Sequence, residues 1–294
     1  MKYKSSRPKG LVASWRPQEK TRALLAQVEE VLETYADHLP LTVRQIFYRL
    51  VGKYGYEKSE RAYSRLLEVL VTARRAQRIP FEAIRDDGWT QRWPHGFSDP
   101  EDFIQAVRDS AERYERDKQA RQPHRLAVAV EAAGMVPQVY RVATPFSVPV
   151  FSSSGFDSLT VKKQMADLVL AEERPLHVLH LSDYDPSGVC IFDALQADVE
   201  AFVGAGERVT FTRIALTSEQ VHRFDLPTSP AKENDKRGDF HSQTCQAEAL
   251  PPDVLADEIR RAIVERVDPD VLREDQAAEK RERIELLEVL GELL

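Results

Sequence analysis

Short apolar runs alternate with amphipathic stretches after Pro123, and this alternation restricts the fold more than any other feature of the chain. The runs have the length of β-strands, and the stretches between them have the length and spacing of α-helices. Strands that alternate with helices form βαβ units, whose strands lie parallel in one sheet. The sequence therefore predicts an α/β domain with a mostly parallel sheet over residues 123–294, completed by C-terminal helices.

The chain before Pro123 has a different pattern. Three amphipathic helices are predicted there, followed by a turn or short β-wing, and this order is typical of a winged-helix domain that binds duplex DNA through one helix. The predicted segments are a basic flexible arm over 1–20, helices over 21–39, 41–53 and 57–78, a turn or wing over 81–93, and a charged connecting helix over 99–122. The winged-helix domain would span residues 21–98.

Charge is distributed unevenly between these two parts. Lys and Arg outnumber Asp and Glu by seven over residues 1–92 and are outnumbered by fourteen over 93–294, which together give the formal net charge of −7. The excess of positive charge in the first part suits a surface that binds nucleic acid. The same charge difference would also arise if the two parts simply differed in their solvent-exposed charged residues. No apolar run is long enough for a transmembrane helix, and no signal peptide is evident. We expect a cytoplasmic protein without a membrane partner, whose two cysteines stay reduced.

Acidic residues follow two of the predicted strands. Glu131 comes after LAVAV, and Asp183 and Asp185 come after HVLHLS. Ligands of parallel sheets bind beyond the carboxyl ends of the strands, and residues i and i+2 of a strand share a side. Carboxylate oxygens are the ligands that Mg²⁺ prefers. The pattern predicts a Mg²⁺ site made by Glu131, Asp183 and Asp185.

The residues after Asp185 allow a second interpretation. In the sequence DPSG, Asp185 could cap the next helix, with Pro186 at its first position. Capping would explain Asp185 but not Asp183. Asp185 could both cap the helix and bind the metal.

Glu131 and the later DYDPSG together resemble a Toprim domain, over residues of about 124–225. The Asp-x-Asp-Pro-x-Gly form is most similar to the topoisomerase VI A subunit and the related meiotic double-strand-break proteins. The resemblance implies that Glu131, Asp183 and Asp185 hold Mg²⁺. Relatives often carry a Lys or another acid soon after the first Glu, whereas this chain continues with Ala-Ala-Gly.

The same family carries its nucleophile in the winged-helix domain, in a pattern like Arg-Asp-[Ile/Val]-[Phe/Tyr]-Tyr. This chain has Arg44-Gln45-Ile46-Phe47-Tyr48. The resemblance implies that Tyr48 attacks a DNA phosphodiester and forms a phosphotyrosyl link. Arg44 lies one helical turn before Tyr48 and would stabilise the developing negative charge. Alternatively, Tyr48 is a core aromatic residue among apolar neighbours.

Other basic residues are candidate DNA contacts. They are Arg49, Arg74, Arg75, Arg78 and Lys232. Arg74, Arg75 and Arg78 lie near a helix C-terminus, where positive charge is also favourable without DNA. Lys232 lies in a polar loop that is either a DNA contact or plain disorder.

The leading prediction is a Mg²⁺-dependent, type IIB topoisomerase-like enzyme that cleaves double-stranded DNA. The family places the tyrosine and the metal on different protomers, which implies a homodimer. The chain contains no phosphate-binding glycine loop, so an ATPase would be a separate subunit, unless the protein acts alone. Two alternatives are a Toprim nuclease that uses metal-activated water and a non-catalytic DNA-binding protein.

Overall fold

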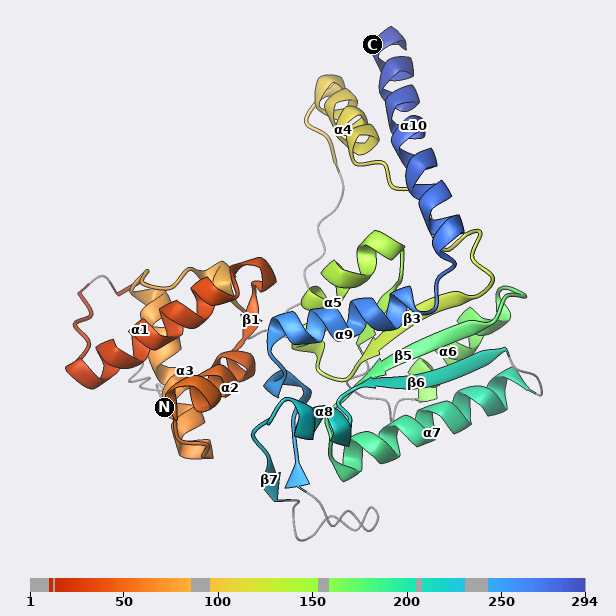
Figure 1. Cartoon of the computed structure of the whole chain (residues 1–294). Helices are drawn as coiled ribbons and strands as arrows, with labels where there is room; N and C mark the ends of the chain where they lie inside the picture. The colour runs from red at the N-terminus through yellow and green to blue at the C-terminus, as the bar shows by residue number, and fades with distance from the viewer. Residues whose placement is uncertain are drawn as a thin grey trace, which may run out of the picture.

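The structure is a computed structural model, and it describes residues 11–12, 14–85, 96–152, 159–204, 208–230 and 243–293. Three helices form the N-terminal part, and a parallel sheet covered by helices forms the rest, as Figure 1 shows. The predicted α/β class with a mostly parallel sheet is confirmed. None of the described helices has both the length and the apolar character needed to cross a membrane.

The N-terminal helices are α1 (Glu19–Thr34), α2 (Val43–Tyr54) and α3 (Glu60–Arg75). They overlap the helices predicted over 21–39, 41–53 and 57–78, but the first ends at Thr34, before its predicted end at residue 39. Two short strands, β1 (Leu41–Thr42) and β2 (Ile84–Arg85), pair in parallel and join the start of α2 to the segment after α3. Residues 86–93 of the predicted wing lie outside the described residues.

Local sequence explains where α2 begins and ends. The Thr42 hydroxyl accepts a hydrogen bond from the Gln45 amide at 3.1 Å, and the Thr42 amide donates to Oε1 of Gln45 at 2.9 Å. This reciprocal capping box satisfies two amides that a helix start leaves unpaired. Gly55 ends the helix with φ of 64°, a conformation that costs glycine little.

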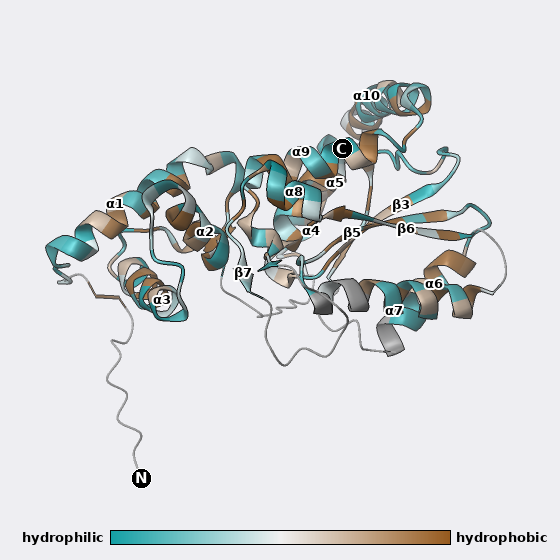
Figure 2. Ribbon diagram, turned by 60° about the horizontal axis from the view of Figure 1, so that its bottom comes forward, coloured by the Kyte–Doolittle hydropathy of each residue, from teal (hydrophilic) through white to brown (hydrophobic). Residues whose placement is uncertain are grey.

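The main sheet contains four strands in the order β4-β3-β5-β6, and all neighbours are parallel. The strands are β3 (Arg125–Val130), β4 (Val150–Ser152), β5 (Leu176–Leu181) and β6 (Val209–Ala215). Helices α6 (Leu159–Leu170) and α7 (Pro186–Val203) cover one face, and α5 (Val136–Ala143) and α9 (Pro252–Val264) cover the other (Figure 2). Nearly all residues of β3 are buried, and alternate ones pack on opposite faces: Leu126, Val128 and Val130 in one apolar cluster, and Ala127 and Ala129 in another.

The apolar core extends across both parts of the chain. One cluster contains Val28, Leu50 and Leu66 of the N-terminal helices together with Val128 and Leu181 of the sheet. A second, smaller cluster lies between the sheet and helices α6 and α7. The first cluster therefore attaches the N-terminal helices to the sheet through continuous packing.

The prediction of one connecting helix over 99–122 is wrong for the second half of that range. Helix α4 (Pro100–Glu112) ends ten residues earlier, and the following segment is irregular. Its cations pair with acids of the C-terminal helix α10 (Pro269–Leu293): Arg116 with Asp275, and Lys118 with Glu279. These distant ion pairs hold the segment in a non-helical path that its local sequence does not encode. In Figure 1, α4 and α10 project together from the body.

Several short elements complete the structure. They are α8 (Ser218–Arg223), the antiparallel strands β7 (Ser229–Pro230) and β8 (Gln243–Thr244), and the 3-10 helices η1 (Ala36–His38), η2 (Phe81–Ala83), η3 (Ala133–Met135), η4 (Thr144–Phe146) and η5 (Ala247–Ala249). Among these, η5 lies between α2 and the carboxyl end of β5.

Candidate active site at the carboxyl ends of the strands

The sheet brings two of the predicted acids into contact. Glu131 follows β3 and Asp183 follows its neighbour β5. The Glu131 amide donates to the Leu181 carbonyl at 2.9 Å, which extends the ladder by one residue. The Asp183 amide then donates to Oε2 of Glu131 at 3.2 Å. Parallel pairing of β3 and β5 is thus what places the Glu131 carboxylate beside the Asp183 backbone.

Burial and like charge act on this pair. Burial raises the pKa of Glu131, and the nearby Asp183 and Asp185 raise it further. Burial also raises the pKa of Asp183, while the Ala247 amide, which donates to its Oδ1 at 2.9 Å, lowers that pKa. Arg213 lies beside them and donates to the Asp183 carbonyl. A positive ligand at this point would relieve the repulsion between the carboxylates.

Asp185 caps helix α7, as the second interpretation of the sequence predicts. Its Oδ1 accepts a hydrogen bond from the Gly188 amide at 2.6 Å, and Pro186 begins the helix. Gly188 packs so tightly that a Cβ there would lie 2.5 Å from the Asp183 carbonyl oxygen. The turn therefore holds both aspartates in place, and Asp185 keeps a carboxylate that faces a cavity.

The acids suit Mg²⁺ by donor type, since all three offer carboxylate oxygens. Within the described residues, however, no three His, Cys, Asp or Glu side chains are grouped as metal ligands. Backbone amides hold an oxygen of each carboxylate instead. The Mg²⁺ site is thus a proposal that rests on donor chemistry and on the repulsion between partly buried acids.

Tyr48 lies in the core and also faces the cavity. Its ring packs edge-on against Phe47, with centroids 5.5 Å apart, and the residue is buried. Its hydroxyl donates to Oε1 of Gln246 at 2.8 Å. Burial raises the pKa of this phenol well above its usual value, whereas Arg44 lowers it. The core and the functional interpretations of Tyr48 are therefore compatible.

A cavity of about 730 Å³ joins Tyr48 to the acidic strand end. Tyr48 and Arg44 of α2 and Asp185, which precedes α7, are among the residues that line it. Lys58 adds a second cation, with its Nζ 5.8 Å from the centre of the Tyr48 ring. The full lining is Arg44, Phe47, Tyr48, Lys58, Ser59, Glu60, Tyr63, Ser64, Leu67, Asp185, Ser229, Pro230, Thr244, Cys245 and Gln246.

Glu248 is an acid near this site that sequence reasoning missed. Its Oε1 accepts a hydrogen bond from the Thr42 hydroxyl at 2.9 Å, and its Oε2 lies 3.9 Å from Nε of Arg44. Burial raises the pKa of Glu248, and Asp183 adds to the rise. In the sequence, Glu248 stands in a short stretch without a strand or a motif before it, so no local signal distinguishes it.

The predicted DNA contacts lie in different environments. Arg49 points inward and donates to the Ala249 carbonyl, and burial lowers its pKa. Arg74 stacks on Phe81, with 4.9 Å between its guanidinium carbon and the ring centre. Arg74 and Arg75 end α3, and Arg78 is exposed just beyond it. Lys232 lies outside the described residues.

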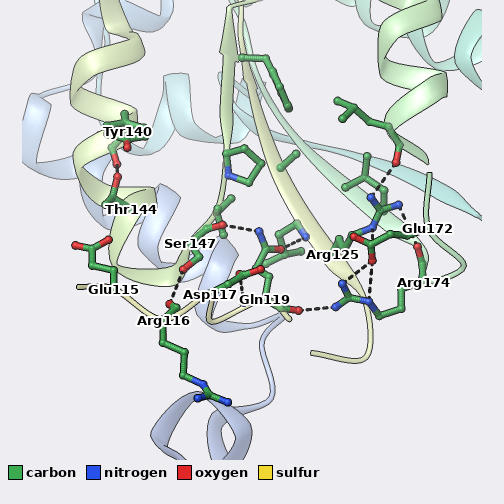
Figure 3. A pocket seen from close by; sticks show the side chains of 17 residues that line it. Glu115, Arg116, Asp117, Gln119, Arg125, Tyr140, Thr144, Ser147, Glu172 and Arg174 are labelled. Carbon is green, nitrogen blue, oxygen red and sulfur yellow. Dashed lines mark hydrogen bonds and ion pairs between the residues drawn. The ribbon is translucent and has the colours of Figure 1, made fainter. Parts of the chain in front are cut away.

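Another cavity, of about 580 Å³, lies at the opposite end of the strands (Figure 3). Its guanidinium groups already have partners within the protein: Arg125 donates to the Leu168 carbonyl at 2.8 Å, and Arg174 pairs with Glu172 at 2.6 Å. These contacts hold the strand starts and the end of α6 in place. The carboxyl end, with its acids and tyrosine, is therefore the better candidate site.

Comparison with known proteins adds no family assignment. No protein-family model matches the chain, and no curated protein is significantly similar to it.

Proposed function

We propose that this protein is a Mg²⁺-dependent enzyme that cleaves DNA through Tyr48, in the manner of the topoisomerase VI A subunit. The N-terminal helices would be its winged-helix domain, and residues 123–294 its Toprim domain. The observation that carries the proposal is the shared cavity, which is lined by Tyr48 and Arg44 of one part and Asp185 of the other. The proposal includes a homodimer. The protein would act either with a separate ATPase subunit or without an ATPase.

The chemistry requires a scissile phosphate beside the Tyr48 hydroxyl. The phenol oxygen forms a new bond to phosphorus and gives its proton to solvent. The bond from phosphorus to one sugar oxygen breaks, and that oxygen takes up a proton, so the step involves no redox change. Burial raises the pKa of Tyr48, and the positive charge of Arg44 opposes that rise and so favours the attacking phenolate. Oε1 of Gln246 accepts a hydrogen bond from the Tyr48 hydroxyl and thereby orients the tyrosine.

Glu131, Asp183 and Asp185 would hold Mg²⁺, and the bound ion would supply positive charge for the phosphate oxygens. Arg44 and Lys58 also line the cavity and would bind the same phosphodiester. The sequence-independent part of DNA binding would come from cations such as Arg78.

The test is incubation of supercoiled plasmid with the protein and Mg²⁺, followed by denaturation with and without protease. We expect protein covalently attached to DNA ends, and we expect Tyr48→Phe to abolish it. Tyr56→Phe is a matched control, because Tyr56 loses a comparable hydrogen bond, to the Ala62 carbonyl at 3.0 Å, and does not line the cavity. Mg²⁺-dependent cleavage that persists in Tyr48→Phe would instead identify a nuclease that uses activated water.

A further inference from the structure

Arg44 lines the cavity and would bind the phosphodiester, and an acid beside it is placed to hold it there. We infer that Glu248 is a positioning residue, which keeps the Arg44 guanidinium directed at the phosphate while Tyr48 attacks. This inference rests on the proposed function and adds a residue to its site. It concerns only the helix that carries the tyrosine and the contacts of that helix, so it is compatible with Mg²⁺ carboxylates supplied by a second protomer.

Glu248 is a carboxylate in a buried position. It lies in η5, and only 7% of its surface is exposed. Burying a carboxylate is costly unless the group is hydrogen-bonded and paired with a positive charge. Its Oε1 accepts a hydrogen bond from the Thr42 hydroxyl at 2.9 Å, and its Oε2 lies 3.9 Å from Nε of Arg44. One oxygen thus fixes the acid to the start of α2, and the other faces the cation.

Contacts near both ends of α2 fix η5 against this helix. Thr42, which caps α2, donates to Glu248, and Arg49, further along the helix, donates to the Ala249 carbonyl. The two elements also pack against each other. The Glu248 carboxylate is therefore a fixed point, to which the longer and more exposed Arg44 side chain adapts.

An aromatic ring holds Arg44 as well. Its guanidinium carbon lies 5.8 Å from the centre of the Tyr63 ring of α3, within the range of a cation–π contact. The Arg44 side chain is nevertheless nearly half exposed, and both residues line the cavity. An exposed arginine samples many rotamers, and fixing it on a ligand costs entropy. Glu248 and Tyr63 would restrict Arg44 before DNA binds and so reduce this cost.

The guanidinium of Arg44 can serve the acid and the phosphate together. It carries five N–H donors in a planar fork, so Nε can face Glu248 while the terminal nitrogens donate to phosphate oxygens. Attack by Tyr48 increases the negative charge on those oxygens, and a donor that is already oriented stabilises this charge. Removing the charge of Glu248 should therefore slow the chemical step more than it weakens DNA binding.

The test compares Glu248→Gln with Glu258→Gln. Glutamine removes the negative charge but keeps an acceptor oxygen for Thr42. Glu258 of α9 is the matched control, because it is buried to the same extent, accepts from the Gln220 side chain at 3.0 Å and pairs with Arg261 outside the cavity. The rate of covalent protein–DNA adduct formation is measured on plasmid with Mg²⁺ and excess protein, over a range of protein concentrations.

We expect Glu248→Gln to slow adduct formation at saturating protein about tenfold. The half-saturating protein concentration should change by less than about threefold. Glu258→Gln should leave both quantities near their wild-type values. A wild-type rate for Glu248→Gln, equal slowing by Glu258→Gln, or an effect confined to the half-saturating concentration would overturn the inference.

A double-variant cycle shows whether Glu248 acts through Arg44. In the Arg44→Ala background, Glu248→Gln should have no further effect, because the guanidinium that the acid positions is gone. A further loss as large as the loss in the wild-type background would overturn the inference. If Arg44→Ala itself forms no measurable adduct, the comparison with Glu258→Gln decides.

Two further outcomes have a defined reading. If circular dichroism shows that Glu248→Gln does not fold, Glu248→Asp replaces it in both comparisons, because the shorter side chain withdraws the carboxylate from Arg44. A wild-type protein that forms no adduct refutes the proposed function, and the inference with it. Adduct from the wild type together with an unaffected Glu248→Gln refutes the inference alone.

Discussion

Only a hydrogen atom fits as the side chain of Gly188, because a Cβ there would lie 2.5 Å from the carbonyl oxygen of Asp183. We expect Gly188→Ala to shift the turn between Asp183 and Asp185 and to lower the free energy of unfolding by about 1–3 kcal/mol. It should also reduce Mg²⁺-dependent cleavage. Gly52→Ala is the matched control: Gly52 lies in α2 with no atom near its would-be Cβ, so a gain of about 0.5–1 kcal/mol is expected. Urea denaturation measures both, and equal effects would refute the role of Gly188.

Two histidines of β5 link stability to pH. Burial lowers the pKa of His180 to about 3 and that of His177 to about 4, both below the ordinary value of 6.5. The unfolded chain therefore binds more protons as pH falls below about 6.5, and the free energy of unfolding should fall with it. We expect a loss on the order of 1 kcal/mol per pH unit between pH 6 and 5. Urea denaturation across pH 5–7.5 should show a shallower slope for His180→Leu; an unchanged slope would contradict this origin.

At the scale of the element, Asp185 both caps α7 and faces the cavity. Asparagine caps helices about as well as aspartate but lacks the charge. We expect Asp185→Asn to keep the wild-type stability and lose Mg²⁺-dependent cleavage, whereas Asp185→Ala should also lose about 1 kcal/mol of stability. Thermal unfolding and the plasmid assay measure the two effects separately. Full cleavage by Asp185→Asn would leave Asp185 with a capping role alone.

Helix α10 is held to the body by buried ion pairs. Lys118 pairs with Glu279, and both side chains are largely buried. Without Lys118, Glu279 keeps only the Arg116 amide and Arg283 as partners, so we expect Lys118→Ala to lower the free energy of unfolding by about 2 kcal/mol. The exposed pair of Arg260 with Asp257 on α9 is the control, and Arg260→Ala should change it by less than about 1 kcal/mol. Similar losses in the two variants would show that burial of the Lys118 pair contributes little.

At the scale of the whole molecule, the continuous core predicts cooperative unfolding. The cluster that contains Leu50 of α2 also contains Leu181 of β5, so neither part keeps its packing without the other. All three tryptophans, Trp15, Trp89 and Trp93, belong to the N-terminal part. We expect tryptophan fluorescence and far-UV circular dichroism to give the same denaturation midpoint. Two separate midpoints would show that the parts unfold independently.

Much of the fold could be predicted because its signals are local. The strands and helices after Pro123 follow from hydrophobic spacing, and the caps at Thr42 and Asp185 follow from single residues. The end of α4 at Glu112 could not, because ion pairs with the distant α10 decide the path of the following segment. The division into domains over 21–98 and 123–294 stays a prediction.

The sequence by itself determined the alternation of strands and helices, and with it the meeting of Glu131 and Asp183, because parallel strands bring their carboxyl ends to one edge. Only the tertiary structure decided that Tyr48 shares a cavity with Asp185 and that Glu248 lies beside Arg44. Those contacts join residues far apart in the chain through side-chain packing, which leaves no periodic pattern in the sequence.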